Sequence, residues 1–419
     1  MSSLDRDEVC AFLYFGYLPP RSWNVDARSS FEVFTERIEQ SPEGTAIEEL
    51  VERGGERWRA VFSSPSERLN VVPLSGGIDS RAILAGLLET RQPGSLRAVT
   101  FGLRGSLDYE IGRRVARAAG VESVGIDLAA VPLERDRLLD VAATTTPGWL
   151  FDTFFNRLMA DRVLEDGIWW SGFMGDTLAG SRLPVRASDV WAEAVRRHVA
   201  TFRAVASVDL LPGDVDPTAL LPTTPLGSSA VLSFDEQLNF FARQPPAHLP
   251  VLVDPRTDIR TPFLDARWRD FILGVPRELR VGKNLYKRIL FRAFPELMHL
   301  PEKGNFGLPA DAADRRVDRR KQAHRVRRRI RSLAPKLAVR PNRMANYLDF
   351  DLAVRRRDDV RTLVRDAIRS LSARGVVEWL DLEGLWTRHV RGTRNHGDAL
   401  MMLAALDLNL EAEERGQTR

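Results

Sequence analysis

The sequence predicts an α/β protein, in which helices flank a parallel β-sheet and further, mostly helical segments extend both ends. Three short apolar runs, at 69–74, 96–101 and 121–128, alternate with helical patterns at 80–89 and 108–119. Strands that alternate with helices in this way form β-α-β units, whose right-handed crossovers cover both faces of a parallel sheet. A fourth apolar run, which also leads to a glycine, extends the same sheet at 167–171.

The segments outside these strands read as helical. Residues 27–69 place Phe31, Phe34 and Ile38 at helix-like spacings, with a break at 41–44. Residues 183–250 alternate apolar and proline-containing stretches, for which we expect helices and loops. Beyond Gly307 the pattern is helical, with breaks at Pro335 and Pro341. We therefore divide the chain into a helical N-terminal segment (1–68), a sheet-containing domain (69–310) and a helical C-terminal segment packed on that domain (311–419).

Composition excludes several classes of protein. Of the 419 residues, 44% are hydrophobic and 28% charged, as in ordinary globular proteins. No stretch approaches the roughly 20 apolar residues of a membrane span, and early acidic residues argue against a signal peptide. The single cysteine, Cys10, excludes an intramolecular disulfide framework and a multi-cysteine zinc site, and we expect it to pack as a small hydrophobic residue. These features favour a cytoplasmic protein.

The strongest motif follows the first predicted strand, where Ser75-Gly76-Gly77-Ile78-Asp79-Ser80 opens a helix. Adjacent glycines let the backbone fold around an anion, and serine hydroxyls and free helix N–H groups donate hydrogen bonds to it. Such a loop can hold pyrophosphate. A carboxylate beside phosphate requires a cation between them, so Asp79 is a candidate Mg²⁺ ligand. The alternative interpretation is a glycine turn in which Asp79 or Ser80 caps the helix.

Polar residues also follow the second and fourth strands. Thr100-Phe101-Gly102 precedes Asp108, which is alternatively a helix cap, with Glu110 adding favourable charge to the first turn. Ser171-Gly172-Phe173-Met174-Gly175-Asp176 follows the fourth strand and is alternatively a capped helix start. Because parallel strands end at one edge of a sheet, where open α/β sheets place ligands, we expect these loops to meet there.

These motifs resemble those of a known family. Ser-Gly-Gly-x-Asp-Ser is similar to the loop of enzymes that split ATP into AMP and pyrophosphate. The segments 171–176, 260–265 (RTPFLD), 285–290 (LYKRIL) and 301–307 (PEKGNFG) resemble further blocks of the asparagine synthetase family, which includes β-lactam synthetases and lasso-peptide cyclases. The resemblance covers nearly the whole chain, from about Val9 to Leu410, including a linker-like stretch at 12–19.

The resemblance implies a fold like that of the adenine nucleotide α-hydrolases, with residues 69–310 as an ATP-pyrophosphatase domain. It implies that Asp79 and Asp176 hold Mg²⁺ and that Lys303 is catalytic, stabilising charge on the α-phosphate and the departing pyrophosphate. Lys287 is a second catalytic candidate, or else a surface lysine. The residues implied to bind ATP are Leu74, Ser75, Gly76, Gly77, Asp79, Ser80, Thr100, Phe101 and Gly172.

We accordingly expect an ATP-dependent carbon–nitrogen ligase that adenylates a carboxylate and transfers the acyl group to ammonia or an amine. The glutaminase domain of glutamine-using relatives is missing, with Ser2 rather than cysteine after Met1, so ammonia would come from a separate glutaminase. Phe173 occupies a position where several relatives carry a catalytic glutamate, and Met174 replaces a glycine. These departures favour an amine on a larger molecule over ammonia as the acceptor. We expect the acid to be a small-molecule or peptide carboxylate.

Two other hypotheses remain. The departures at 173 and 174 also suit an inactive ATP-binding scaffold. The third hypothesis, a tRNA-modifying enzyme, follows from the basic segment 315–331 (RRVDRRKQAHRVRRRIR), because tRNA lysidine synthetases share the Ser-Gly-Gly-x-Asp-Ser loop. Interspersed aspartates and the lack of aromatic residues for base stacking disfavour nucleic acid. We expect a solvated helix face or a contact with a carrier or partner protein. The six histidines show no metal-ligand spacing.

Overall fold

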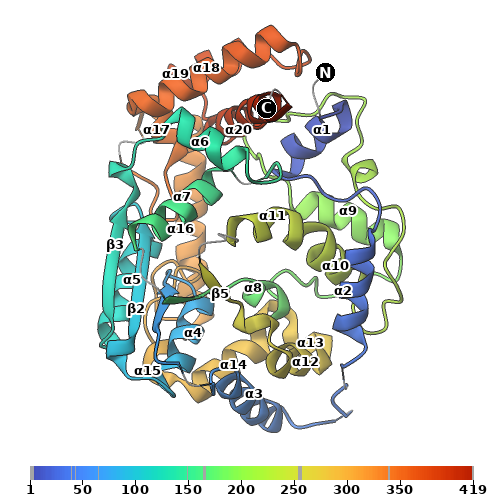
Figure 1. Ribbon diagram of the computed structural model, residues 1–419, viewed down its shortest axis with the longest axis vertical. Coiled ribbons are helices and arrows are strands. Elements are labelled where there is room, and N and C mark those ends of the chain that lie inside the picture. The colour runs from blue at the N-terminus through green and yellow to red at the C-terminus, as the bar shows by residue number, and fades with distance from the viewer. Residues whose placement is uncertain are drawn as a thin grey trace.

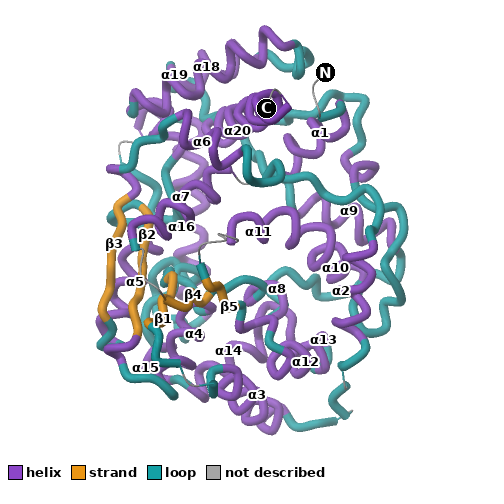
Figure 2. Tube along the Cα trace, viewed as in Figure 1, coloured by secondary structure: helices purple, strands orange, loops and turns teal. Residues whose placement is uncertain are grey.

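The computed structural model describes residues 4–38, 40–42, 44–64, 66–148, 150–163, 167–252, 257–337 and 340–417. Its centre is a five-stranded parallel sheet with the order β3-β2-β1-β4-β5 (Figure 2). Val71 in the middle strand lies opposite Arg97 on one side and Trp169 on the other. The strands are β1 (Leu69–Pro73), β2 (Leu96–Gly102), β3 (Glu122–Asp127), β4 (Gly167–Trp170) and β5 (Asp258–Arg260).

The parallel α/β architecture and the first four strands are confirmed at nearly the predicted bounds. The fifth strand was not predicted. It has only three residues, two of them charged, and it pairs with β4 at the edge of the sheet, where Ile259 lies opposite Trp169. A strand this short carries no apolar run or alternation that a sequence pattern could reveal.

Helices surround the sheet. Before β1 they are α1 (Arg6–Phe15), α2 (Val25–Thr35) and α3 (Ile47–Val61). Between β1 and β4 they are α4 (Asp79–Leu88), η1 (Pro93–Ser95), α5 (Leu107–Ala118), η2 (Leu128–Ala130), α6 (Arg135–Ala142) and α7 (Leu150–Arg162). Between β4 and β5 they are α8 (Gly175–Leu178), α9 (Trp191–Thr201), η3 (Pro217–Leu220), α10 (Phe234–Gln237), the π-helical η4 (Leu238–Arg243) and α11 (Gln244–Leu252).

The remaining helices follow β5. Up to residue 298 they are η5 (Pro262–Leu264), α12 (Ala266–Gly274), α13 (Arg277–Arg280), η6 (Val281–Lys283), α14 (Asn284–Ala293) and α15 (Pro295–Met298). The C-terminal ones are α16 (Asp314–Leu333), η7 (Pro335–Leu337), α17 (Phe350–Arg356), α18 (Asp358–Arg374), α19 (Leu382–Val390) and α20 (Gly397–Gln417). The expected breaks are confirmed, since α2 and α3 flank 41–44, and Pro335 and Pro341 follow the end of α16. Glu43, within the first break, lies outside the described residues.

Two buried hydrophobic clusters pack on the two faces of the sheet. Val72 belongs to the cluster that includes residues of α3, α4, α5, α12 and α14, whereas Val71 belongs to the cluster that includes residues of α6, α7, α17, α18 and α20. Helix α1 contributes to both clusters, with Cys10 and Phe15 in the first and Val9 and Phe12 in the second. In Figure 1 the C-terminal helices α18 to α20 lie at the top and α3, α12 and α14 at the bottom.

Cys10 is fully buried, as expected of a small hydrophobic residue, and burial raises the pKa of its thiol to about 11. Within the described part of the chain, no helix combines the length and the apolar character that crossing a membrane would require.

Candidate active site

The loop between β1 and α4 is closed by its two serines. The Ser75 N–H donates a hydrogen bond to Ser80 Oγ at 3.2 Å, and the two hydroxyl oxygens are also 3.2 Å apart. The Gly77 N–H donates to Ser75 Oγ at 3.2 Å. Helix α4 has Ile78 as its N-cap and no side-chain capping bond, so the alternative of Asp79 or Ser80 as the cap is wrong. The first-turn N–H groups of α4 therefore lack a side-chain cap.

Asp79 and Asp176 are brought together by a lysine that the sequence analysis did not select. Lys283 Nζ lies 3.0 Å from Asp79 Oδ2 and 2.5 Å from Asp176 Oδ1. Asp79 begins α4 after the central strand, and Asp176 lies in α8 after the neighbouring strand β4. The Lys283 side chain is 11% exposed, whereas the Asp176 side chain is 55% exposed. The pair of carboxylates thus lies at the carboxyl edge of the sheet and opens to solvent on the Asp176 side.

The charges in this trio depend on one another. Burial raises the pKa of Asp79, and the nearby Lys283 ammonium opposes this shift. Burial acts in the same direction on Asp176, but Lys283 outweighs it and holds the pKa of Asp176 below its usual value. Burial by itself lowers the pKa of the Lys283 ammonium, but the two carboxylates more than offset this and raise it above the ordinary value. The lysine therefore stays positively charged between the two acids.

The backbone around Lys283 has a conformation that fixes the lysine in place. Lys283 has φ 65°, in the left-handed region that non-glycine residues rarely adopt, and it is the N-cap of α14. The preceding Gly282 N–H donates to the Gly180 carbonyl at 3.0 Å. A Cβ at Gly180 would lie 2.4 Å from the Arg280 carbonyl, so only glycine allows this approach. Arg280 in turn pairs with Glu236 at 2.6 Å, and both side chains are only 2% exposed.

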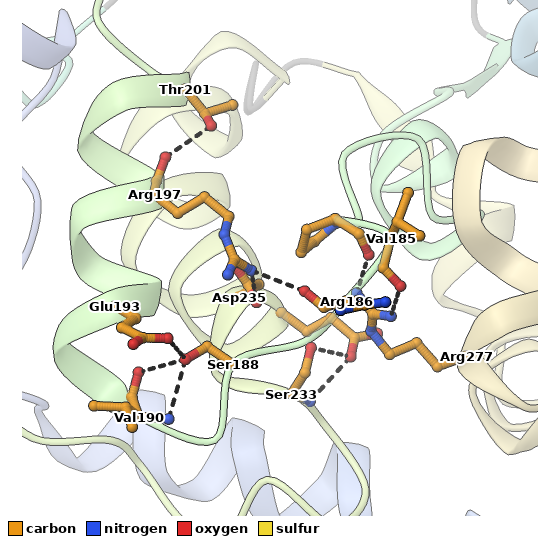
Figure 3. A network of polar contacts seen from close by, with 12 residues as sticks. Val185, Arg186, Ser188, Val190, Glu193, Arg197, Thr201, Ser233, Asp235 and Arg277 are labelled. Carbon is orange, nitrogen blue, oxygen red and sulfur yellow. Dashed lines mark hydrogen bonds and ion pairs between the residues drawn. The ribbon is translucent and has the colours of Figure 1, made fainter.

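A polar network anchors the chain that follows Asp176 (Figure 3). Arg197 of α9 donates to both carboxylate oxygens of Asp235 and to the Arg186 carbonyl. Arg277 of α13 donates to the Val185 carbonyl at 3.3 Å. Ser188 donates to Glu193 Oε2 at 2.7 Å. The loop at 181–190 is thereby tied to α9, α10 and α13, the last of which leads to Lys283.

A second cluster joins Lys303 to the glycine loop. Lys303 Nζ donates to Asp108 Oδ2 and to Asn346 Oδ1, and the Lys303 N–H donates to the Gly76 carbonyl at 2.8 Å. The other Asp108 oxygen accepts the Gly76 N–H at 3.0 Å. A Cβ at Gly76 would lie 3.0 Å from the Leu107 carbonyl oxygen and 3.1 Å from the Lys303 Cβ, so a side chain there would crowd this contact.

The interpretation of Asp108 as a helix cap is therefore wrong. Ser106 caps α5 instead, with its hydroxyl accepting the Tyr109 N–H. Glu110 does lie in the first turn, and its carboxylate accepts the Gly105 N–H at 2.9 Å. The third capping alternative, at 171–176, is also wrong, because the N-cap of α8 is Met174, with φ 65° and no side-chain capping bond.

Lys287 lies away from the two aspartates. Its Nζ is 4.0 Å from Glu302 Oε2, and its side chain is 33% exposed. Burial raises the pKa of Glu302, and Lys287 opposes that shift. Lys287 thus supports the residue next to Lys303 but contacts neither Asp79 nor Asp176 among the ion pairs of the described residues.

The other residues implied to bind ATP lie around the same strand ends. The Thr100 hydroxyl donates to the Leu74 carbonyl at 3.0 Å and is buried, so it braces the edge of the sheet. The Phe101 ring stacks on Tyr347 with 5.6 Å between centroids. A Cβ at Gly172 would lie 3.9 Å from the Asp79 Cβ, which places Gly172 beside that aspartate. Phe173 is half-buried and Met174 is buried.

The donor set fits a magnesium ion that is shared with phosphates. Among the described residues, no group of three or more His, Cys, Asp or Glu side chains could hold a metal ion. Asp79 and Asp176 already bind one cation together, the Lys283 ammonium, so their carboxylates form a cation-binding site. Mg²⁺ commonly takes one or two carboxylates and completes its shell with water and phosphate oxygens. Asp79 and Asp176 meet this requirement.

Neither a scan against protein-family models nor a search of curated proteins found a match to this chain. Interpretation of the site thus rests on its own geometry. Lys283 was missed because it precedes its helix by one position and is separated from Asp79 by 204 residues. One sequence signal was available: Gly282-Lys283-Asn284 has the composition of a turn that enters a helix, with a cation on it.

Proposed function

We propose that this protein is an ATP-dependent amide synthetase, which adenylates a carboxylate and transfers the acyl group to ammonia or an amine. One observation carries the proposal. Asp79 and Asp176 follow adjacent parallel strands and share Lys283, beside a glycine loop whose helix has no side-chain cap. This combination suits a triphosphate and its magnesium ion at the carboxyl edge of the sheet.

The loop 75–80 and the start of α4 would bind the phosphates. Uncapped N–H groups at a helix N-terminus, together with the helix dipole, favour an anion. Magnesium, held by Asp79 and Asp176, would neutralise charge on the phosphate oxygens. Lys283 supplies a fixed positive charge at the same carboxylates, and Lys303 supplies a second one at Gly76. Fixed cations that face developing negative charge are often the largest single contribution to catalysis.

The reaction has two steps. An oxygen of the substrate carboxylate attacks the α-phosphorus of ATP, and the bond to the pyrophosphate oxygen breaks. The nitrogen of the acceptor then attacks the carbonyl carbon of the acyl-adenylate, the bond to AMP breaks, and the nitrogen loses a proton to water. The Phe173 ring cannot accept this proton. We propose that the acceptor is a larger amine, or ammonia from a separate glutaminase. The acid is a small-molecule or peptide carboxylate, presented free or on a carrier protein. The compartment is the cytoplasm, which supplies the ATP.

Hydroxylamine trapping tests the first step without knowledge of the amine, because hydroxylamine converts an acyl-adenylate into a hydroxamate. With a panel of carboxylic acids, ATP and MgCl₂, we expect equal amounts of hydroxamate, AMP and pyrophosphate. Asp176→Asn should lower the rate by about 10²- to 10³-fold, as loss of a charge-stabilising group does. Asp189→Asn, an exposed aspartate in the following loop, is the matched control.

The rival hypothesis of an inactive ATP-binding scaffold has its own support, because Lys283 already pairs with both aspartates and Phe173 replaces an acidic group. It predicts ATP binding with no pyrophosphate from any acid. Binding of ATP that is lost in Asp176→Asn, together with no hydroxamate over the whole panel, would select the scaffold.

A further inference from the structure

A cavity of about 850 Å³ lies between α16 and the segments that carry 340–344 and 395–398. This volume is typical of pockets for small-molecule ligands. The basic character of the cavity stands out, because five arginines line it: Arg327, Arg328, Arg331, Arg340 and Arg343. The basic helix is exposed over most of its length, as the sequence analysis expected, and part of it forms one wall of a cavity that is open to solvent.

Two of these arginines are already engaged. Arg331 donates to Asp349 Oδ2 at 2.6 Å and to the Arg340 carbonyl at 2.8 Å. Arg343 Nε donates to the Gly105 carbonyl at 3.3 Å. For the guanidinium groups of Arg327, Arg328 and Arg340, in contrast, the described residues provide no hydrogen-bond acceptor or ion-pair partner. These three exposed cations can therefore bind a ligand.

The two acidic residues of the cavity do not cancel this charge. Asp398 is occupied, because its Oδ2 accepts the N–H groups of Ala206 and Ser207 at 2.9 and 3.1 Å. Burial, reinforced by the neighbouring carboxylates of Asp349 and Asp398, raises the pKa of Asp351 to about 6, so this group still carries its charge at neutral pH. Five arginines outnumber the two carboxylates of the lining, so the cavity has a net positive charge.

The cavity also shares two of its walls with the Lys303 cluster. The ring of His324, on α16, lies 5.4 Å from that of Phe306 in the loop that carries Lys303. The Arg343 carbonyl accepts the Leu107 N–H at 2.7 Å, directly before Asp108. Asn346, three residues beyond Arg343, accepts a hydrogen bond from Lys303. A ligand in the cavity would therefore contact the segments that hold Lys303.

We propose that this cavity binds the part of the substrate remote from the reacting carboxylate, and that this part carries at least two negative charges, as carboxylates or phosphates. The inference rests on the proposed adenylation reaction and adds the class of the acid. Arg327, Arg328 and Arg340 provide the charge-assisted hydrogen bonds. The cavity is lined by no Phe, Tyr or Trp side chain among the described residues, which favours a compact polyanion over a nucleic acid, whose bases need stacking partners.

The test uses calorimetric titration of the full chain with two blocked peptides of equal length, tetraglutamate and a phosphoserine peptide. The cavity variant is Arg327→Gln, Arg328→Gln, Arg340→Gln. Its matched control, Arg315→Gln, Arg316→Gln, Arg319→Gln, removes the same charge from exposed positions of the same helix that do not line the cavity. We expect the preferred peptide to bind at least about tenfold more weakly to the cavity variant and unchanged to the control. Tighter binding of one peptide identifies its charged group.

Three outcomes would overturn the proposal. The first is that neither peptide binds the unmodified protein, and the second is that peptide affinity falls equally in the cavity variant and the control. The third is that a single-stranded oligonucleotide binds more tightly than either peptide and that both variants weaken its binding alike. The last outcome would indicate a nucleic-acid surface along the whole helix. ATP binding and hydroxamate formation are measured in parallel. If peptide binding depends on the cavity but no acid gives a hydroxamate, the adenylation reaction is refuted and the anion-binding site remains. If a hydroxamate forms but peptide binding does not depend on the cavity, only the proposed role of the cavity is refuted.

Discussion

At the scale of single residues, the site depends most on Lys283. Its replacement by methionine keeps the length of the side chain but leaves Asp79 and Asp176 facing each other without a cation. Because Asp176 is half exposed, we expect a loss of about 1–3 kcal/mol in the free energy of unfolding rather than the larger cost of a fully buried pair. Pyrophosphate release should fall by about 10²-fold or more.

The response to magnesium distinguishes the electrostatic role of the Lys283 ammonium from a role of its side chain in packing. A divalent cation can replace the ammonium between the two carboxylates, so MgCl₂ should stabilise Lys283→Met more than the unmodified protein. Urea unfolding with and without MgCl₂, at constant ionic strength, measures the difference. Lys287→Met is the control, because the nearest carboxylate to Lys287 is that of Glu302, at 4.0 Å. Equal magnesium responses in all three proteins would contradict the assignment of these aspartates.

His198 makes stability depend on pH. Burial, together with the charge of the nearby Arg243, lowers the pKa of its imidazole to about 3. The unfolded chain takes up a proton near pH 6.5, which the folded protein cannot do. The resulting stability is complete above about pH 6.5 and decreases by about 1.4 kcal/mol per pH unit as the pH falls towards 3.

Replacement of His198 by phenylalanine removes this dependence, and the rings of Phe15 and Phe202 that surround His198 can accommodate it. As the pH falls from 7 to 5, the free energy of unfolding of the variant should therefore rise by about 2 kcal/mol relative to that of the unmodified protein. Denaturant titrations at both pH values provide the comparison. Parallel pH curves for the two proteins would show that His198 titrates normally in the fold.

At the scale of elements, the junction between α13 and α14 decides where Lys283 lies, and a buried ion pair holds it. Arg280→Met leaves the Glu236 carboxylate buried without its counter-ion, which should cost about 3–5 kcal/mol in the free energy of unfolding. Adding Glu236→Gln should recover part of this loss, because the neutral amide needs no counter-ion and its oxygen can still accept the Ser233 hydrogen bonds.

Chemical denaturation of the two single variants and the double variant measures this coupling. Pyrophosphate release should stay low in the double variant even where stability recovers, because the segment that leads to Lys283 loses the ion pair between Arg280 and Glu236. Additive losses of stability would show that Arg280 and Glu236 act independently.

Elements differ in how far the sequence predicts them. Strands β1 and β2 are mostly buried and are short, mainly apolar runs, and α5 shows a clear apolar face, so all three were predicted within about two residues. The strand β5 and the four-residue α8 are held by neighbouring segments rather than by any internal pattern. The left-handed conformations of Lys283 and Met174 have the same cause, since tertiary contacts impose them on residues that do not favour them.

At the scale of the whole molecule, motif spacing placed the loops of β1, β2 and β4 at one edge of the sheet, because parallel strands leave no other arrangement. The partners of these loops could not be predicted in this way. Lys283, Asn346 and the cavity beside α16 come from segments that reach the edge through long-range packing, and no local period encodes that approach. The sequence therefore located the carboxylates and the glycine loop, but not the positions of the cations that pair with them or the cavity beside α16.

Because α1 packs into both hydrophobic clusters, and the sheet separates them, we expect the clusters to unfold as one unit. Leu371→Ala, at a fully buried position of α18 in the cluster that contains Val71, should cost about 2–5 kcal/mol in the free energy of unfolding. Cys10 lies in the other cluster and is the single thiol, so its labelling by a disulfide reagent reports the opening of that cluster.

If the clusters are coupled, Leu371→Ala accelerates labelling of Cys10 by tenfold for every ~1.4 kcal/mol that it removes from the free energy of unfolding measured in urea. This relation holds at concentrations of the disulfide reagent at which the labelling rate of Cys10 is proportional to the population of protein in which its cluster is open. Leu333→Ala, at a position 59% exposed, should change neither quantity. If Leu371→Ala loses much stability in urea but its Cys10 labelling rate is unchanged, the C-terminal helices open alone. The cluster that contains Cys10 and residues of α4 and α14 would then fold without them.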